Sequence, residues 1–151
     1  KIDFKVTTVE KVKYGYYIIM KGWIQQEYII ILNLHAANTG GPRFMKQLLL
    51  VLRNEIDSNT IIVGDFNASL KILKLSSARS LEDLQIFCWQ KVNRETMDLN
   101  DMLEHTDLTD IYRTFYLRTA EYTFFSLPDL TFSKMDYVIG HKTCQNTLFK
   151  N

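Results

Sequence analysis

Apolar residues form two long runs near the start of the chain. Residues 16–23 are rich in β-branched and aromatic side chains, and residues 27–34 (EYIIILNL) are almost entirely apolar. Both compositions favour strands, and an apolar run without polar alternation predicts a strand that is buried on both faces. Gln25 and Gln26 suit a turn between the runs, so we expect an antiparallel pair of strands.

A helix is predicted immediately after this pair. Residues 38–41 (NTGG) have the composition of a loop, and Pro42 suits the first turn of a helix, where its missing N–H is not needed. From Phe44 to Ile56, apolar residues recur at helical spacing. The turn-forming residues 57–59 (DSN) should end this helix.

A short apolar run at residues 60–63 (TIIV) follows and ends at Gly64. Like the run at 27–34, it lacks polar alternation, and we interpret it as a second buried strand. If both strands are covered on both faces, their apolar side chains form the centre of the core. Near-complete burial is therefore predicted for Ile29, Ile31, Leu32, Ile61, Ile62 and Val63.

The second half of the chain is predicted to contain a helix and two further strands. Apolar spacing indicates a helix over 95–104. β-forming residues indicate strands at 122–126 and 132–139, with a turn around Pro128 between them. Residues 71–90 fit no element well, and we expect a surface excursion there. Strand runs interrupted by helices, with hairpins at both ends, favour two packed sheets with helices outside them.

Composition narrows the class of protein only a little. A chain of 151 residues, 46% hydrophobic and 13% aromatic, is long and apolar enough to form one domain with a sizeable core. The formal net charge of +1 neither suggests nor excludes a nucleic-acid partner. Cys88 and Cys144 lack zinc or disulfide spacing and predict reduced thiols in an intracellular protein, nuclear or cytoplasmic. No apolar stretch is long enough to cross a membrane, so no membrane partner is expected.

The sharpest chemical feature is the segment 64–67 (GDFN), which directly follows the predicted strand at 60–63. In an extended segment the side chains of Asp65 and Asn67 point to the same side, roughly 7 Å apart. A carboxylate there can accept a proton or bind a metal ion, and a carboxamide can donate a hydrogen bond to an oxyanion. The alternative is an Asx turn that only closes the strand, which is the commoner use of such residues.

Four other residues are candidates for a site. Asp136 lies inside a predicted strand, where a buried carboxylate needs a neighbouring cation or histidine; the alternative is a solvent-facing position. Arg113 and Thr123 can contact phosphate, although each alone is more often a surface ion pair or a strand residue. His35, at the end of the strand at 27–34, is either a general base or a structural histidine.

Several of these pieces occur in one order in a known protein family. Five segments resemble, in this order, motifs of the apurinic/apyrimidinic endonucleases of the endonuclease/exonuclease/phosphatase superfamily: 33–38 (NLHAAN), 64–67 (GDFN), 110–113 (DIYR), 122–124 (YTF) and 134–137 (KMDY). The residues within these segments are more similar still to those of the endonuclease of LINE-type retrotransposon reverse transcriptase proteins. The resemblance covers nearly the whole chain except residues 71–90, and five motifs in order make it specific.

The resemblance implies an α/β fold, a four-layer α/β sandwich in which two mixed sheets pack face to face with helices outside. It also implies magnesium-dependent (Mg²⁺) hydrolysis of phosphodiester bonds, in the LINE case the nicking of DNA. DNA is then the implied partner, and a larger retrotransposon polyprotein or ribonucleoprotein is a further one.

The resemblance also implies a role for each candidate residue. Asp65 orients or deprotonates the attacking water, and Asn67 stabilises the transition state together with the metal. Asp136 holds a catalytic histidine in the required tautomer. Thr123 contacts the DNA backbone, with Arg113 as a second candidate for phosphate. His35 stands where the family has a tyrosine that contacts phosphate, and it is assigned to substrate binding.

Several family positions have no counterpart within residues 1–151. The family's N-terminal Asn and metal-binding Glu align before Lys1, and its Ser-Asp-His strand aligns after Asn151. We therefore expect a single partial domain, with no metal ligand retained with confidence, that does not nick DNA alone. Two alternatives stay open. One is a decayed or domesticated fragment that acts at most as a binding module, and the other is a related enzyme with a phospholipid or inositol phosphate substrate.

Overall fold

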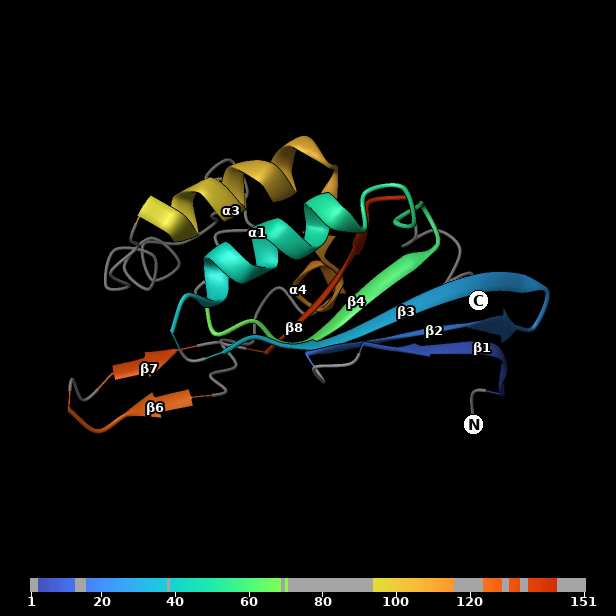
Figure 1. Cartoon of the computed structure of the whole chain (residues 1–151), viewed down its shortest axis with the longest axis horizontal. Coiled ribbons are helices and arrows are strands. Elements are labelled where there is room, and N and C mark those ends of the chain that lie inside the picture. Colours follow the sequence, from blue (N-terminus) through green and yellow to red (C-terminus); the bar gives the residue numbers. More distant parts are fainter. Residues whose placement is uncertain are drawn as a thin grey trace.

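The structure, a computed structural model, describes residues 3–12, 16–37, 39–68, 70, 94–115, 124–128, 131–133 and 136–143. Its elements are β1 (Phe4–Lys11), β2 (Tyr17–Ile24), β3 (Glu27–His35), α1 (Gly41–Val51), β4 (Thr60–Asp65), α3 (Arg94–His105), β5 (Leu108–Asp110), α4 (Ile111–Phe115), β6 (Phe124–Ser126), β7 (Thr131–Ser133) and β8 (Asp136–His141). A mixed six-stranded sheet has the order β1-β2-β3-β4-β8-β5, and β6 and β7 form a separate two-stranded sheet. Helices α1 and α3 lie together along one face of the large sheet (Figure 1). The α/β class predicted from the sequence is confirmed.

The first three strands form an antiparallel meander. β2 and β3 pair along their whole length, with Ile24 opposite Glu27, and Gln25 adopts a φ of 56° between them. The hairpin predicted around Gln25 and Gln26 is therefore confirmed. β1 adds an outer strand by pairing with β2. The sequence pattern does not predict β1, because all but its first residue are exposed and the strand has no continuous apolar face.

The chain passes from β3 through α1 into β4, which lies parallel to β3. The helix contains Pro42 in its first turn, as predicted, but it ends at Val51 and not near Ile56. Residues 52–55 form turns, and Ile56 still packs against the core as a partly buried side chain. Because β3 and β4 are parallel, their carboxyl ends lie at the same end of the sheet.

The second half of the chain completes the large sheet by insertion. β8 lies between β4 and β5 and is antiparallel to both. The single strand predicted over 132–139 is wrong: its first part pairs as β7 with β6 in the small sheet, and only β8 joins the large one. The helix predicted over 95–104 is confirmed as α3. β5 and α4 were not predicted, because three and five residues are too few to produce a recognisable period.

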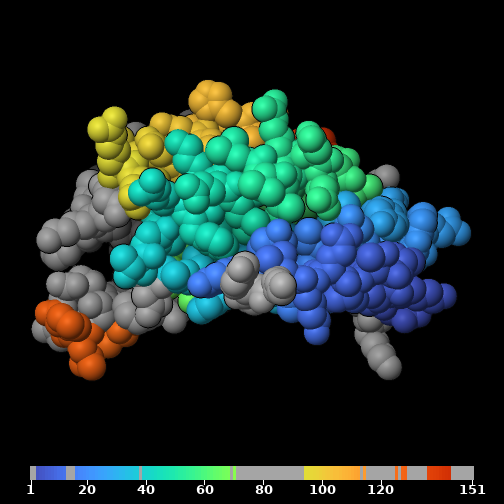
Figure 2. All heavy atoms as spheres, viewed as in Figure 1, coloured from blue at the N-terminus to red at the C-terminus, as the bar shows by residue number. Residues whose placement is uncertain are grey.

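The main core lies between the large sheet and helices α1 and α3. The sheet contributes Leu32, Ile62 and Ile139, and the helices contribute Met45 and Leu99; each of these side chains is at most 2% exposed. Burying such a side chain contributes about 1.5–3 kcal/mol through the hydrophobic effect. In the space-filling view, α1 and α3 form the upper part of the molecule, and β1 and β2 form the near surface below them (Figure 2).

The prediction that both faces of β3 and β4 are fully buried is wrong. Three of the six side chains concerned are almost fully buried: Ile29, Leu32 and Ile62. The other three are only half-buried: Ile31, Ile61 and Val63. These half-buried residues share the sheet face turned away from the two helices, because side chains alternate between faces along a strand. Ile29 lies on this face too and is nevertheless buried. The described elements cover this second face less completely than the helices cover the first.

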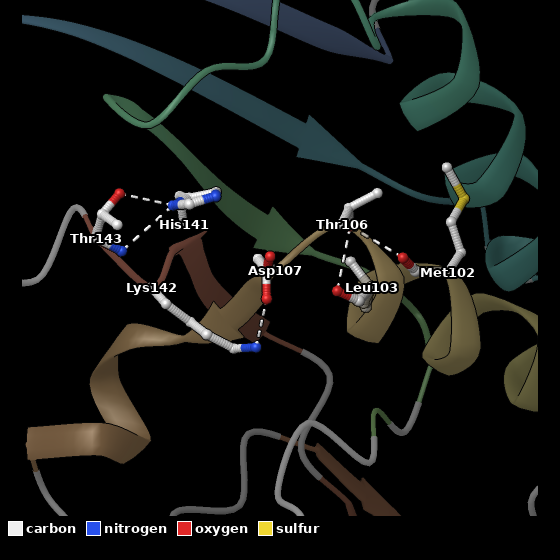
Figure 3. A network of polar contacts seen from close by, with 7 residues as sticks. All are labelled: Met102, Leu103, Thr106, Asp107, His141, Lys142 and Thr143. Atoms are coloured by element: carbon white, nitrogen blue, oxygen red, sulfur yellow. Dashed lines mark hydrogen bonds and ion pairs between the residues drawn. The ribbon is translucent and has the colours of Figure 1, made fainter.

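A polar network closes one end of the sheet, where β8 meets the loop after α3. The side chain of Lys142 donates to Oδ1 of Asp107 at 2.7 Å, and its main-chain N–H donates to the carbonyl oxygen of Asp107 at 3.0 Å (Figure 3). The Thr106 hydroxyl donates to the carbonyl oxygen of Met102 at 2.9 Å. The two Lys142 contacts fix the end of β8 that lies farthest from Asp136, and the Thr106 contact holds the end of α3.

Some sequence predictions concern residues outside the described ones: the surface excursion at 71–90 and the thiols of Cys88 and Cys144. Within the described part of the chain, no helix is both long and apolar enough to cross a membrane.

Candidate functional site

Three titratable side chains lie in one row at one end of the large sheet. They come from neighbouring strands: His35 ends β3, Asp65 ends β4, and Asp136 begins β8. Asp65 is the direct register partner of His35 on one side and of Asp136 on the other. Residues directly opposite each other in a sheet point to the same face, with Cβ atoms roughly 5 Å apart. Asp65 therefore lies between an imidazole and a second carboxylate.

The two carboxylate oxygens of Asp65 have different surroundings. Oδ1 accepts a hydrogen bond from the main-chain N–H of Asn67 at 2.9 Å. Oδ2 lies 3.8 Å from Nδ1 of His35, too far for a hydrogen bond but close enough for an ion pair when the imidazole is protonated. The side chains of His35 and Asp65 are 69% and 32% exposed, so both are accessible to solvent. The Asn67 contact fixes the carboxylate and leaves Oδ2 on the side of His35.

Asn67 is fixed beside this row by its main chain and its side chain. Its φ of 47° lies in the left-handed region, and its Nδ2 donates to the carbonyl oxygen of Ala36 at 3.1 Å. The bond from the main-chain N–H of Asn67 to Oδ1 of Asp65 forms the Asx turn considered from the sequence. The extended geometry assumed for residues 64–67 is wrong beyond Asp65, because the strand ends there and the turn brings the carboxamide back against the end of β3.

Gly64 permits the close approach of strands that positions Asp65. Its φ is 134°, and a Cβ added there would collide with the main-chain carbonyl oxygen of Leu34. One residue later, the carbonyl oxygen of Asp65 accepts a hydrogen bond from the N–H of Ala36 at 2.8 Å, which extends the β3–β4 contact past the end of β3. A glycine immediately before the carboxylate is therefore a structural requirement of this strand pair.

Two buried aromatic residues that the sequence analysis did not select pack next to the row. Phe66 is fully buried and packs edge-on against Tyr137, with ring centroids 5.5 Å apart. The Tyr137 hydroxyl accepts a hydrogen bond from the N–H of Leu70 at 2.9 Å. Each ring neighbours a row residue in sequence, Phe66 next to Asp65 and Tyr137 next to Asp136. An aromatic residue adjoining each candidate carboxylate was the available sequence signal.

The other predicted site residues are not placed in this row. The main chain of Arg113 lies in α4, but its side chain is not described, and Thr123 lies outside the described residues. His141 is at the opposite end of β8, where its Nδ1 lies 2.7 Å from the Thr143 hydroxyl (Figure 3). His105, to which the sequence analysis gave no role, contacts the carbonyl oxygen of Asp101 in its own helix.

The β6–β7 hairpin connects to the same end of the sheet. β7 ends at Ser133 and β8 begins at Asp136, so the hairpin is joined to the row by a short link, and Figure 1 shows it projecting away from the large sheet. Its turn carries Leu127, which is 75% exposed. An exposed apolar tip therefore extends from the end of the sheet that carries the row.

Two of the three side chains of the row carry oxygen donors for a metal ion. Asp65 and Asp136 provide the oxygen atoms that magnesium prefers, and magnesium often takes only one or two protein carboxylates while keeping several waters. Among the described residues, no group of three or more His, Cys, Asp or Glu side chains is arranged to hold a metal ion. The row therefore suits a magnesium ion that takes most of its ligands from water and substrate, and does not form a closed cage.

Solved structures of other proteins share the fold of this chain, although no protein-family model matches its sequence. The endonuclease domain of TRAS1, a telomere-specific non-LTR retrotransposon, matches with a TM-score of 0.57 and 12% identity, over 89% of this chain and 56% of that one. An AP endonuclease from Archaeoglobus fulgidus matches with a TM-score of 0.54 and 12% identity, over 92% and 59%. D. rerio TDP2 complexed with single strand DNA product matches with a TM-score of 0.54 and 14% identity, over 93% and 55%.

These matches cover nearly all of this chain, which spans a little more than half the length of each of the three proteins. At identities this low the similarity concerns the fold alone. Two of the three proteins are endonucleases by name, and the third was solved with a DNA product. The chain has the fold of the endonuclease/exonuclease/phosphatase superfamily, as its motifs imply.

Proposed function

We propose that this chain supplies the central part of a DNA-nicking phosphodiester hydrolase of the LINE retrotransposon endonuclease type. The observation that carries the proposal is the row of His35, Asp65 and Asp136, with Asn67 fixed beside it. The endonucleases among the similar structures favour the same reaction class. As part of such a protein, the chain would act on DNA within a larger retrotransposon polyprotein or ribonucleoprotein.

Asp65 is the residue best placed to act on the attacking water. Its Oδ1 is engaged by the N–H of Asn67, whereas Oδ2 lies 3.8 Å from Nδ1 of His35 and can accept a proton from water. His35 is largely exposed and would donate to a phosphate oxygen beside that water. Asn67 would stabilise charge on the phosphate, since a carboxamide is a hydrogen-bond donor and the contact with Ala36 fixes it beside the row.

The remaining roles follow the resemblance. Asp136 would orient a histidine, as carboxylates do in other hydrolases. Thr123 and Arg113 would contact the DNA backbone. A bound Mg²⁺ ion would supply charge neutralisation at the phosphate. Asp65 and Asp136 would hold this ion, because two carboxylates side by side repel each other and are stabilised by a cation.

A second layer over the sheet belongs to the same proposal. Ile31, Ile61 and Val63 are half-buried on the face turned away from the helices. In a four-layer α/β sandwich a second sheet packs on such a face at about 10 Å and buries it. We therefore expect the complete domain to be this four-layer sandwich.

Residues 1–151 alone should not nick DNA. The metal-binding Glu and the catalytic His of the resemblance have no counterparts within these residues, and Asp136 is paired in register with Asp65. Removing one member of a coupled catalytic group typically costs orders of magnitude in rate. The alternative function, a non-catalytic binding module, predicts the same inactivity, so a binding measurement has to separate the two.

The test combines DNA binding with plasmid nicking. Fluorescence anisotropy with a short labelled duplex should show binding that strengthens when Mg²⁺ is added, because the ion screens the carboxylates of the row from phosphate. Asp65→Asn should remove most of this Mg²⁺ dependence. Asp98→Asn, the same change on the exposed side of α3, should leave it intact. No nicking of supercoiled plasmid is expected.

Each other outcome has a definite meaning. A DNA affinity that is unchanged by both Mg²⁺ and Asp65→Asn would contradict the hydrolase site and favour the binding module. Absence of DNA binding would reject both functions. Mg²⁺-dependent nicking that disappears in Asp65→Ala would show that the row is catalytically sufficient and that the predicted inactivity is wrong.

A further inference from the structure

β1 forms the outer edge of the large sheet. Among the described strands it pairs with β2 alone, and residues from Lys5 to Lys11 are all exposed. Figures 1 and 2 show it along the near, outer side of the molecule. Val6 and Val9 are 49% and 50% exposed. An edge strand of this length presents a row of main-chain N–H and C=O groups to any strand that can pair with it.

A β-bulge interrupts β1 near its middle. Val6 lies opposite Gly22 and Thr8 lies opposite Lys21, so Thr7 is an additional residue on the β1 side. The Thr7 hydroxyl donates to the carbonyl oxygen of Lys21 at 2.9 Å and fixes the bulge. An additional residue shifts the alternation of side chains by one position from there onward.

The shift brings the two exposed valines to one face. Val6 and Val9 are three residues apart, and in a regular strand they would point to opposite faces. Here they lie opposite Gly22 and Met20, which are two residues apart on β2 and therefore share a face.

The same shift brings two opposite charges to the other face. Lys5 and Glu10 lie opposite Trp23 and Ile19, which are four residues apart on β2 and share a face. Read outward from the bulge in both directions, β1 therefore carries threonine, then valine, then a charge, and the two charges have opposite sign.

We propose that β1 is a self-association edge and that its occupant is β1 of a second copy of this chain. The two strands pair antiparallel about a two-fold axis between Thr7 and Thr8. In this register Val6 faces Val9 of the second copy, and Lys5 faces Glu10 of the second copy. The two members of each pair point to the same face of the joined sheet, so their side chains can contact each other across the strands.

The bulge selects this register. Bulges often protect edges against pairing, but this one lies on the two-fold axis, so the regular segments on either side of it pair with each other. In a strand without a bulge, the same axis would bring together residues that point to opposite faces. β2 separates β1 from β3, so the interface leaves the row at His35 and Asp65 uncovered. The proposal therefore stands independently of the proposed function.

A charge exchange between two variants tests the register. Sedimentation equilibrium should show the native chain passing from its monomer mass of 17.8 kDa to twice that mass as concentration rises. Lys5→Glu alone and Glu10→Lys alone each place two like-charged pairs across the axis, and each should raise the midpoint concentration at least about tenfold. An equimolar mixture of the two variants restores opposite charges in both pairs, and its midpoint should return toward the native value.

Two controls keep the outcome interpretable. Glu10 also contacts Lys21, but Lys21 keeps Glu55 in the variant, and circular dichroism checks that both variants fold. Glu27→Lys makes the same charge change at the exposed start of β3 and should leave the midpoint unchanged. A native chain that stays monomeric up to about 1 mM would overturn the proposal. The proposal would also be overturned by a mixture that associates no better than the single variants. A dimer whose midpoint concentration is unchanged by both substitutions would overturn it as well.

Discussion

At the scale of single residues, the sequence identified the carboxylates but not their neighbours. Asp65 and Asn67 could be selected because a carboxylate and a carboxamide follow a buried strand within three positions. The contact between Asp65 and His35 could not be predicted, because it depends on the parallel register of β3 and β4. The register is a tertiary contact between two strands, and the periodicity of either strand alone does not specify it.

Replacing Gly64 with alanine should destabilise the fold by roughly 2–4 kcal/mol. The φ of 134° is unfavourable for any L side chain, and the added Cβ would collide with the backbone of β3. Gly40 is the matched control: its φ of 74° is also left-handed, but no heavy atom lies within 4 Å of an added Cβ. Gly40→Ala should therefore cost only about 1 kcal/mol. Urea unfolding followed by circular dichroism measures both, and equal costs would contradict the close approach.

At the scale of elements, local pattern was sufficient where a helix or strand had one consistently apolar side. The β2–β3 hairpin, β4 and α3 were predicted for that reason. It failed for β1, whose alternation is interrupted by the bulge, and for the run at 132–139, which the structure divides between two sheets. That division depends on which strand each half meets, and this is a tertiary contact.

A single lysine connects two of these strands with the turns after α1. Nζ of Lys21 on β2 lies 3.1 Å from Glu10 on β1 and 3.3 Å from Glu55 in the turns after α1. Hydrogen bonds to Glu10 first, and then to Glu55, raise the pKa of Lys21 above its usual 10.5. A group whose pKa is raised by folding stabilises the folded state below its unfolded pKa, and this stabilisation is lost as pH rises through the folded value.

Lys21→Met should therefore show a pH-dependent loss of stability. The free energy of unfolding should differ from that of the native chain by a constant, small amount at neutral pH, because these side chains are partly exposed. The difference should shrink as the pH rises above 10.5. Urea unfolding across this range gives the measurement, with Lys5→Met as a control for loss of an exposed lysine. A difference that persists unchanged at high pH would show that Lys21 acts through packing and not through charge.

At the scale of the whole molecule, the sequence correctly predicted the α/β class and the superfamily fold. It overestimated burial on one sheet face. An uninterrupted apolar run indicates that both faces of a strand can be buried. Whether a face is buried depends on which other elements pack against it. Ile31, Ile61 and Val63 are apolar but only half-buried. The row at Asp65 likewise needs β8, a strand from far along the chain, to complete it.

The unequal cover of the two faces should be measurable by truncating adjacent isoleucines. Ile62 is fully buried against the helices, and Ile62→Ala should cost about 3–4 kcal/mol through lost burial and a residual cavity. Ile61 is half-buried on the other face, and Ile61→Ala should cost about half as much. The two variants lose the same atoms from neighbouring positions in one strand, so urea unfolding compares the faces directly. Equal losses would mean that the second face is covered as fully as the first.

The late position of β8 in the chain also affects the order in which the sheet forms during synthesis. β1 to β4 follow one another in the chain with one helix between β3 and β4, so this half can form from contacts close in sequence, which assemble quickly. During synthesis, at about 5–20 residues per second, β4 would emerge several seconds before β8. His35 and Asp65 would already be side by side, while the edge of β4 that later binds β8 stays unpaired. The nascent chain therefore exposes an unpaired strand edge beside Asp65 until β8, which begins at Asp136, is synthesised and pairs with it.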